Sequence, residues 1–125
     1  AHIAPVVNKF HILKFLINSI LISITLLQFS CGEKLEIHSS KTIMFEGKLY
    51  KIDADEPFSG MVFNTYIGGQ REYEGEYKDG IPNGLLVYWY ANGNKMREGQ
   101  LRGGMPVGRW ITYTEDGSVK ETLDH

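Results

Sequence analysis

Apolar and polar residues alternate along three similar stretches in the second half of the chain. Residues 59–66, 83–90 and 107–114 are rich in β-branched and aromatic side chains over about six positions, the usual length of a strand. Each stretch ends at a pair of turn residues, which are Gly68-Gly69, Asn92-Gly93 and Asp116-Gly117. Such pairs adopt positive φ at little steric cost, so they predict two-residue hairpin turns of the primed types. The returning strands are then expected at residues 70–77, 94–101 and 118–123.

This pattern recurs at an interval of 24 residues. Five sets of glycine or proline keep the interval: Gly60, Gly84 and Gly108; Gly69, Gly93 and Gly117; Gly75 and Gly99; Gly80 and Gly104; Pro82 and Pro106. Agreement of independent positions on one period indicates internal repetition. We expect the six glycines of the first two sets to be structural turn residues. Because proline cannot donate to a strand ladder, we also expect loops at residues 78–83 and 102–107.

These features predict an all-β domain over residues 45–125. Its tandem β-hairpin repeats of 24 residues would form a single elongated, twisted antiparallel sheet.

The first 30 residues have a different character. Lys9 and Lys14 precede an apolar run at residues 15–27, in the order and proportions of a secretory signal. The run is shorter than the about 20 apolar residues that a membrane-spanning helix needs. We therefore predict that residues 1–30 form a helical signal segment that is cleaved, with a retained membrane span or a buried core element as alternatives. Residues 1–7 have the character of an extraneous extension.

The segment that ends this run, Leu26-Leu27-Gln28-Phe29-Ser30-Cys31-Gly32, resembles the lipobox of bacterial lipoproteins. Ser30 and Cys31 match that motif, whereas Gln28 departs from it. The resemblance implies that Cys31 is lipidated, that residues 31–44 form the anchor and a linker, and that the protein resides in the bacterial cell envelope, facing the periplasm or the cell surface. Two acyl chains on one cysteine suffice for stable anchoring. The alternative is an ordinary signal with Cys31 as a spare thiol.

Composition and charge narrow the candidate chemistry. From Cys31 onward the chain has 15 acidic residues and only 11 basic ones, which argues against nucleic acid as a partner. Cys31 is the only cysteine, so an internal disulfide and a zinc site with several thiolates are excluded. The best carboxylate cluster is Asp53, Asp55 and Glu56, which we interpret as a turn in preference to a weak calcium site. No histidine falls inside the repeats, so we expect no catalytic activity, no metal and no cofactor.

The repeat units carry a family resemblance at residues 74–80, 82–84 and 88–93. With the preceding Tyr50 and residues 56–60, they resemble the MORN repeat variant, and within it the YwqK-type antitoxin family. The resemblance implies binding in place of catalysis.

Strand alternation assigns the side chains to two faces. One face would carry mostly apolar residues and form the core: Phe63, Val87, Ile111, Thr65, Trp89 and Tyr113. The other face is aromatic yet bears polar groups, as interfaces often do. We expect a binding surface on it, made by Tyr66, Tyr88, Tyr90 and Trp110. The alternative is that these residues only cover a thin sheet.

Three partner classes follow from these features. A lipid-anchored module that binds or scaffolds a protein or glycan is the first. A protein that neutralises a cognate toxin, as the family name implies, is the second. Lipid-headgroup binding is the third, and the acidic charge favours it least.

Overall fold

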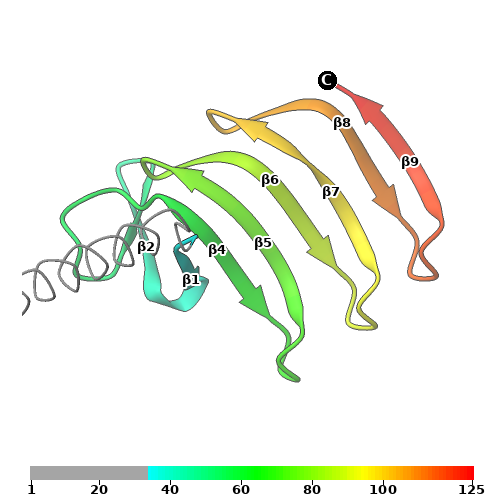
Figure 1. Cartoon of the computed structure of the whole chain (residues 1–125), viewed down its shortest axis with the longest axis horizontal. Helices are drawn as coiled ribbons and strands as arrows, with labels where there is room; N and C mark the ends of the chain where they lie inside the picture. The colour runs from blue at the N-terminus through cyan, green and yellow to red at the C-terminus, as the bar shows by residue number, and fades with distance from the viewer. Residues whose placement is uncertain (1–33) are drawn as a thin grey trace, which may run out of the picture. The chain divides into compact units, whose positions relative to one another are not determined.

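The computed structural model describes residues 34–125, which form strands and connecting turns (Figure 1). The elements are β1 (Glu36–His38), the 3-10 turn η1 (Ser39–Lys41), β2 (Thr42–Phe45), β3 (Lys48–Lys51), β4 (Gly60–Thr65), β5 (Arg71–Lys78), β6 (Ile81–Trp89), β7 (Lys95–Arg102), β8 (Met105–Tyr113) and β9 (Val119–Asp124). The expected signal segment and Cys31 lie outside the described residues.

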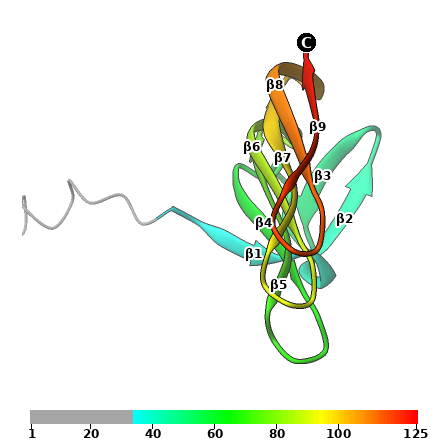
Figure 2. The ribbon, with the colours of Figure 1, turned by 90° about the vertical axis from the view of Figure 1, so that its right-hand side faces the viewer.

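The strands form one large sheet and one small sheet. The large sheet has seven strands in the order β1-β4-β5-β6-β7-β8-β9, and β2 pairs with β3 in a separate hairpin. The prediction of an all-β fold is confirmed. The large sheet is mixed, however, because β1 pairs with β4 in parallel while the other neighbours are antiparallel. Figure 2 views this sheet along its edge, with β2 and β3 on one side of it.

Residues 36–44, which belong to the linker predicted at residues 31–44, form β1, η1 and most of β2. Ile37 of β1 aligns with Val62 of β4, and its side chain is only 9% exposed. The small β2–β3 hairpin continues directly from η1. The linker prediction fails because the partner of β1 is more than twenty residues away, and local polarity does not reveal such pairing.

The three hairpin turns at one end of the sheet hold three residues, not the predicted two. The Gly69 N–H donates to Tyr66 O at 2.9 Å, and Gly69 has a φ of 89°. Gly93 and Gly117 lie at the same places in the next two hairpins, with φ values of 89° and 90°. This arrangement is a turn followed by a left-handed glycine, the usual solution for a three-residue hairpin.

Two-residue turns occur instead at the opposite end of the sheet, where longer loops were expected (Figure 1). Asp79-Gly80 and Gly103-Gly104 all have positive φ and connect β5 to β6 and β7 to β8. Pro82 and Pro106 therefore lie inside strands, paired with Tyr77 and Leu101. Each proline is tolerated because it follows the hydrogen-bonded pair that closes the turn and so lies in a pair without backbone bonds. The pairing of β6 with β7 and of β8 with β9 begins only beyond the proline, at Gly84 and Arg109.

Gly60, Gly84 and Gly108 also lie in strands and not in turns. Gly84 and Gly108 are interior to β6 and β8 and have φ values of 121° and 66°. A backbone kink with positive φ explains why glycine recurs there without a change of chain direction.

The buried side chains come from both faces of the large sheet, so the predicted division into a core face and a binding face is wrong. Val87 is 2% exposed on the face expected to be the core. Val62 and Trp110, at 3% and 5% exposed, are buried on the other face. A single-layer sheet has no second layer that would bury one face alone. Side chains on each face are therefore buried by neighbouring residues on that same face.

The main apolar cluster lies where the β2–β3 hairpin meets the large sheet. It consists of the buried side chains Ile37, Leu49, Phe58 and Val62, against which Tyr73 and Tyr77 pack. The two backbone bonds from Leu49 N to Gly80 O and from Phe58 N to Leu49 O hold the hairpin in place. This cluster fixes the end of the sheet from which the remaining strands extend.

Candidate binding surface

A row of five side chains crosses one face of the large sheet from β5 to β9. Strand register aligns them in sequence across five strands, as Tyr73, Tyr88, Arg97, Thr112 and Glu121. Directly aligned residues of antiparallel strands project to the same face. We call this set the Tyr88 row. It combines two phenol rings, a cation, a hydroxyl and a carboxylate on one surface.

The aromatic end of the row is a tyrosine pair. The ring centroids of Tyr73 and Tyr88 lie 5.0 Å apart with the rings tilted by 46°. Tyr73 is half-buried, and burial raises the pKa of its phenol, with a hydrogen bond to Tyr77 as the second cause. Tyr88 is 37% exposed. Tyr73 thus supports the ring of Tyr88 from below the surface.

The cationic centre of the row rests on a buried tryptophan. The Arg97 guanidinium lies 4.9 Å from the Trp110 ring centroid, within the range of a cation–π contact. Trp110 donates from Nε1 to Gln100 O at 3.2 Å. A Cβ at Gly99 would overlap the indole carbons, so this glycine makes room for the ring. Trp110 was expected to contact a ligand directly, but its position is beneath Arg97.

The middle of the row is shallowly hollowed. A cavity of about 480 Å³ is lined by Tyr88, Met96, Arg97, Thr112 and Glu121. Four of these residues belong to the row, and Met96 adds an apolar edge. Such a surface can receive a side chain of a partner and offers it both a cation and an anion.

Tyr66 and Tyr90 contact the neighbouring hairpin in place of solvent. The Tyr66 hydroxyl donates to Trp89 O at 2.7 Å, and the Tyr90 hydroxyl donates to Tyr113 O at 2.8 Å. Both bonds join residues 23 apart, so each links one hairpin to the next. In the third unit Thr114 replaces the tyrosine, and its hydroxyl bonds locally to Asp116. Of the four expected binding residues, only Tyr88 lies exposed in the row.

These two hydroxyl groups predict a measurable share of stability. We expect Tyr66→Phe and Tyr90→Phe each to lower the free energy of unfolding by about 1 kcal/mol, because each leaves a carbonyl without its donor. Urea unfolding of the two variants measures the loss. Tyr88→Phe, at an exposed ring, is the matched control and should change stability by less than about 0.5 kcal/mol. Equal effects at all three positions would contradict the linking role.

Ion pairs on the opposite face of the sheet involve no residue of the Tyr88 row. Glu98 accepts from Lys95 at 2.6 Å and from the Tyr113 hydroxyl at 2.7 Å. The bond from Lys95, followed by that from Tyr113, holds the pKa of the Glu98 carboxyl below its ordinary value. Glu76 pairs in the same way with Lys34, and this lowers the pKa of its carboxyl. These acids are partnered within the chain.

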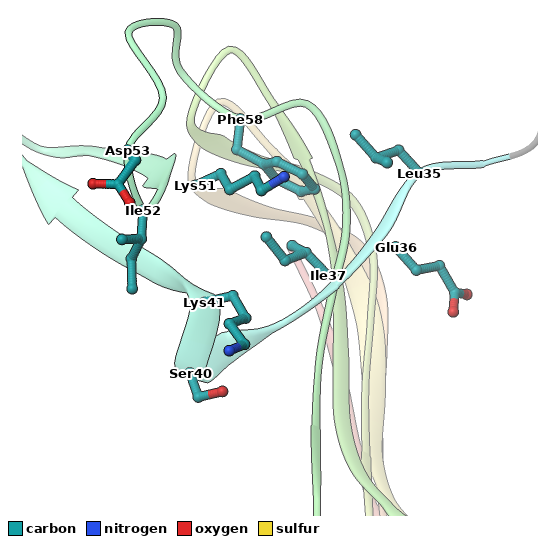
Figure 3. Close-up of a pocket in the computed structure, with 9 residues that line it drawn as sticks. All are labelled: Leu35, Glu36, Ile37, Ser40, Lys41, Lys51, Ile52, Asp53 and Phe58. Atoms are coloured by element: carbon teal, nitrogen blue, oxygen red, sulfur yellow. The ribbon is translucent and has the colours of Figure 1, made fainter.

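A second hollow of about 540 Å³ lies between β1 and the segment after β3 (Figure 3). The buried side chains of Ile37 and Phe58 contribute its apolar surface. Lys41, Lys51 and Asp53 add charged groups to its lining. Asp53 was considered for a calcium site with Asp55 and Glu56, and within residues 34–125 no cluster of three potential metal ligands occurs.

Sequence reasoning missed Arg97 and Glu121 as members of the surface. A signal was available, because Tyr73, Arg97 and Glu121 are spaced by 24, as are Tyr88 and Thr112. The 24-residue interval must be applied to the second strand of each hairpin as well as to the first. Tyr73, Arg97 and Glu121 then fall at equivalent positions.

No family model, curated protein or solved structure matches this chain. Within the part of the chain that the structure describes, no helix has the length and apolar character needed to cross a bilayer.

Proposed function

We propose that this protein is a non-catalytic binding module of the bacterial cell envelope, built from tandem hairpin repeats of the MORN-variant type and anchored by lipid at Cys31. Its role is to bind a partner protein through the Tyr88 row. The observation that carries the proposal is the composition of that row on an open face, with two tyrosines, an arginine and a carboxylate aligned across five strands.

The composition favours a protein over other ligands. Tyrosine, tryptophan and arginine dominate the binding energy of protein interfaces. Arg97 is held over Trp110, so it loses less conformational freedom on binding than a free arginine would. The partner that fits best offers an acidic side chain to Arg97 and a basic one to Glu121, which lie two strands apart.

The anchoring part of the proposal is tested by mass. Intact mass spectrometry of the protein extracted from bacterial membranes should give a chain that begins at Cys31 and carries a diacylglyceryl group. An unprocessed chain recovered from the cytosol would overturn the envelope assignment while leaving the binding surface in place.

The binding part is tested by photo-crosslinking from the row in intact cells. A photoreactive phenylalanine analogue at position 88 should give one discrete adduct with another protein, because the Tyr88 ring faces the partner. Adding Arg97→Glu should reduce the adduct at least tenfold, since it reverses the central charge. Arg102→Glu reverses another exposed charge outside the row and should leave the yield unchanged.

An adduct that responds equally to both charge reversals would contradict the assigned surface. If the crosslinked protein proves toxic to cells that lack this chain, the role is neutralisation of a toxin. If it does not, scaffolding in the envelope remains the function.

A further inference from the structure

We propose that β9 is a dimerisation edge, at which a second copy of this chain adds its own β9 in antiparallel orientation about a two-fold axis at Leu123. The proposal does not depend on the function assigned to the Tyr88 row. Three observations carry it: the open edge of β9, two departures from the repeat pattern at that edge, and the complementarity of the strand with itself.

Within residues 34–125, no strand pairs with the outer edge of β9. β9 is the last strand of the large sheet there, and all six of its residues are exposed. His125 N donates to Gly108 O at 2.9 Å, so these two residues form a hydrogen-bonded pair. Because such pairs alternate along an antiparallel ladder, the backbone groups of Leu123 and Glu121 also face β8. The N–H and C=O groups of Thr122 and Asp124 therefore face outward. A partner strand can bond to both residues.

Two substitutions distinguish this edge from the interior of the sheet. Gly75 and Gly99 occupy one position of the interval. Gly75 is covered by Tyr73 of its own strand and by Leu86 of the following strand, and Gly99 is covered by Trp110 of the following strand. The residue 24 positions after Gly99 is Leu123, which is 48% exposed and leaves no such room. The contact of a glycine with a side chain of the following strand, which joins one hairpin of this chain to the next, therefore cannot form at this edge.

The second departure is at Thr114. Tyr66 and Tyr90 each reach the next hairpin through a hydroxyl, but Thr114 bonds within its own turn, to Asp116 and Ser118. A partner on this edge is therefore held by backbone pairing and by the side chains of β9 itself.

The strand is complementary to an inverted copy of itself. With the axis at Leu123, the two Leu123 side chains meet across a pair without backbone bonds, where Cα atoms lie about 4.5 Å apart. Glu121 then aligns with His125 of the other copy, and Thr122 aligns with Asp124. Glu121 thus lies beside an imidazole, and the exposed leucine is covered. Thr122 lies beside the Asp124 carboxylate, which also pairs with Arg109 of its own chain at 3.0 Å. The outward groups of Thr122 and Asp124 supply the ladder bonds in this register.

Such pairing has a consequence for binding. Aligned residues of antiparallel strands project to the same face, so the Tyr88 rows of the two copies would lie on one continuous face. A dimer would thus present two binding surfaces side by side, each with its Glu121 flanked by His125 of the other copy, and this raises the apparent affinity for a multivalent partner.

Disulfide trapping of the full chain tests the axis. Leu123→Cys places two thiols within the Cα range of a disulfide, about 4.4–6.8 Å, if the proposed pairing forms. Val119→Cys is the matched control, because Val119 is also an exposed apolar residue of β9 but would lie about 27 Å from its copy at 3.4 Å per residue. Under mild oxidation we expect at least fivefold more covalent dimer from Leu123→Cys than from Val119→Cys. Cys31 is present in both chains and sets a common background.

A second variant separates pairing from chance collision. Thr122→Pro removes an outward N–H and leaves the bonds to β8 intact, so it should reduce trapping by Leu123→Cys to the level of Val119→Cys. Sedimentation of the otherwise unaltered chain should show a concentration-dependent dimer that Thr122→Pro abolishes. Equal trapping at positions 123 and 119, or a purely monomeric chain in sedimentation, would overturn the proposal.

Discussion

Phe58→Ala is expected to lower the free energy of unfolding by about 3–5 kcal/mol, the usual cost of emptying a buried phenylalanine site. Phe58 is 6% exposed and packs with Ile37, Leu49 and Val62 in the cluster that joins the β2–β3 hairpin to the large sheet. Its loss would leave a cavity where the β2–β3 hairpin meets the large sheet. Chemical denaturation measured by tryptophan fluorescence gives the value.

Phe45→Ala is the matched control for this prediction. Phe45 belongs to the β2–β3 hairpin that the cluster joins to the large sheet, but it is 60% exposed. Its removal should therefore change stability by less than about 0.5 kcal/mol. If Phe45→Ala proved as costly as Phe58→Ala, the hairpin would be packed through its opposite face, and the assigned cluster would be wrong.

Gly99→Ala is expected to destabilise the protein by about 1–3 kcal/mol, although alanine is normally the better strand residue. The added Cβ would overlap the indole of Trp110, which is 5% exposed and cannot move aside without losing its bond to Gln100 O. A change in the emission of Trp110 should accompany the loss of stability, because the ring must shift toward water. Arg97 would lose its support in the same event.

The sign of this effect should reverse when the tryptophan is absent. In a Trp110→Ala background the Cβ has space, and Gly99→Ala should then stabilise by about 0.4–1 kcal/mol by restricting the unfolded chain. Gly99 does not have positive φ, so no backbone strain opposes the alanine. A destabilisation of the same size in both backgrounds would show that the glycine serves a purpose other than making room for the ring.

The sequence predicted the hairpins well because alternation and glycine pairs are local signals. It predicted the turn types poorly, since Gly68-Gly69 suits either a two-residue or a three-residue turn, and the choice depends on how Tyr66 and Gln70 align. It placed Pro82 in a loop because proline lacks a donor, whereas Pro82 pairs with Tyr77 at a position without backbone bonds and needs no donor there. Each error came from applying a correct local rule without the neighbouring strand.

The surface was harder to predict than the strands. Tyr66, Tyr88 and Tyr90 look alike in sequence, yet two of them bond to a neighbouring backbone carbonyl and only Tyr88 is exposed. Whether a tyrosine hydroxyl finds a partner depends on contacts 23 residues away. The pairing of β1 with β4 is a similar case, because no local pattern marks Glu36–His38 as a strand.

The most direct test of the central claim is hydroxyl-radical footprinting of the protein in intact cells and after purification. Tyr88 and Met96 should be modified in the purified protein and protected in cells, because a partner covers the row there. Phe45 and Met105, which are 60% and 68% exposed and lie outside the row, should be modified to the same extent in both states. Equal modification of Tyr88 in both states would contradict the claim that this surface is where the protein binds.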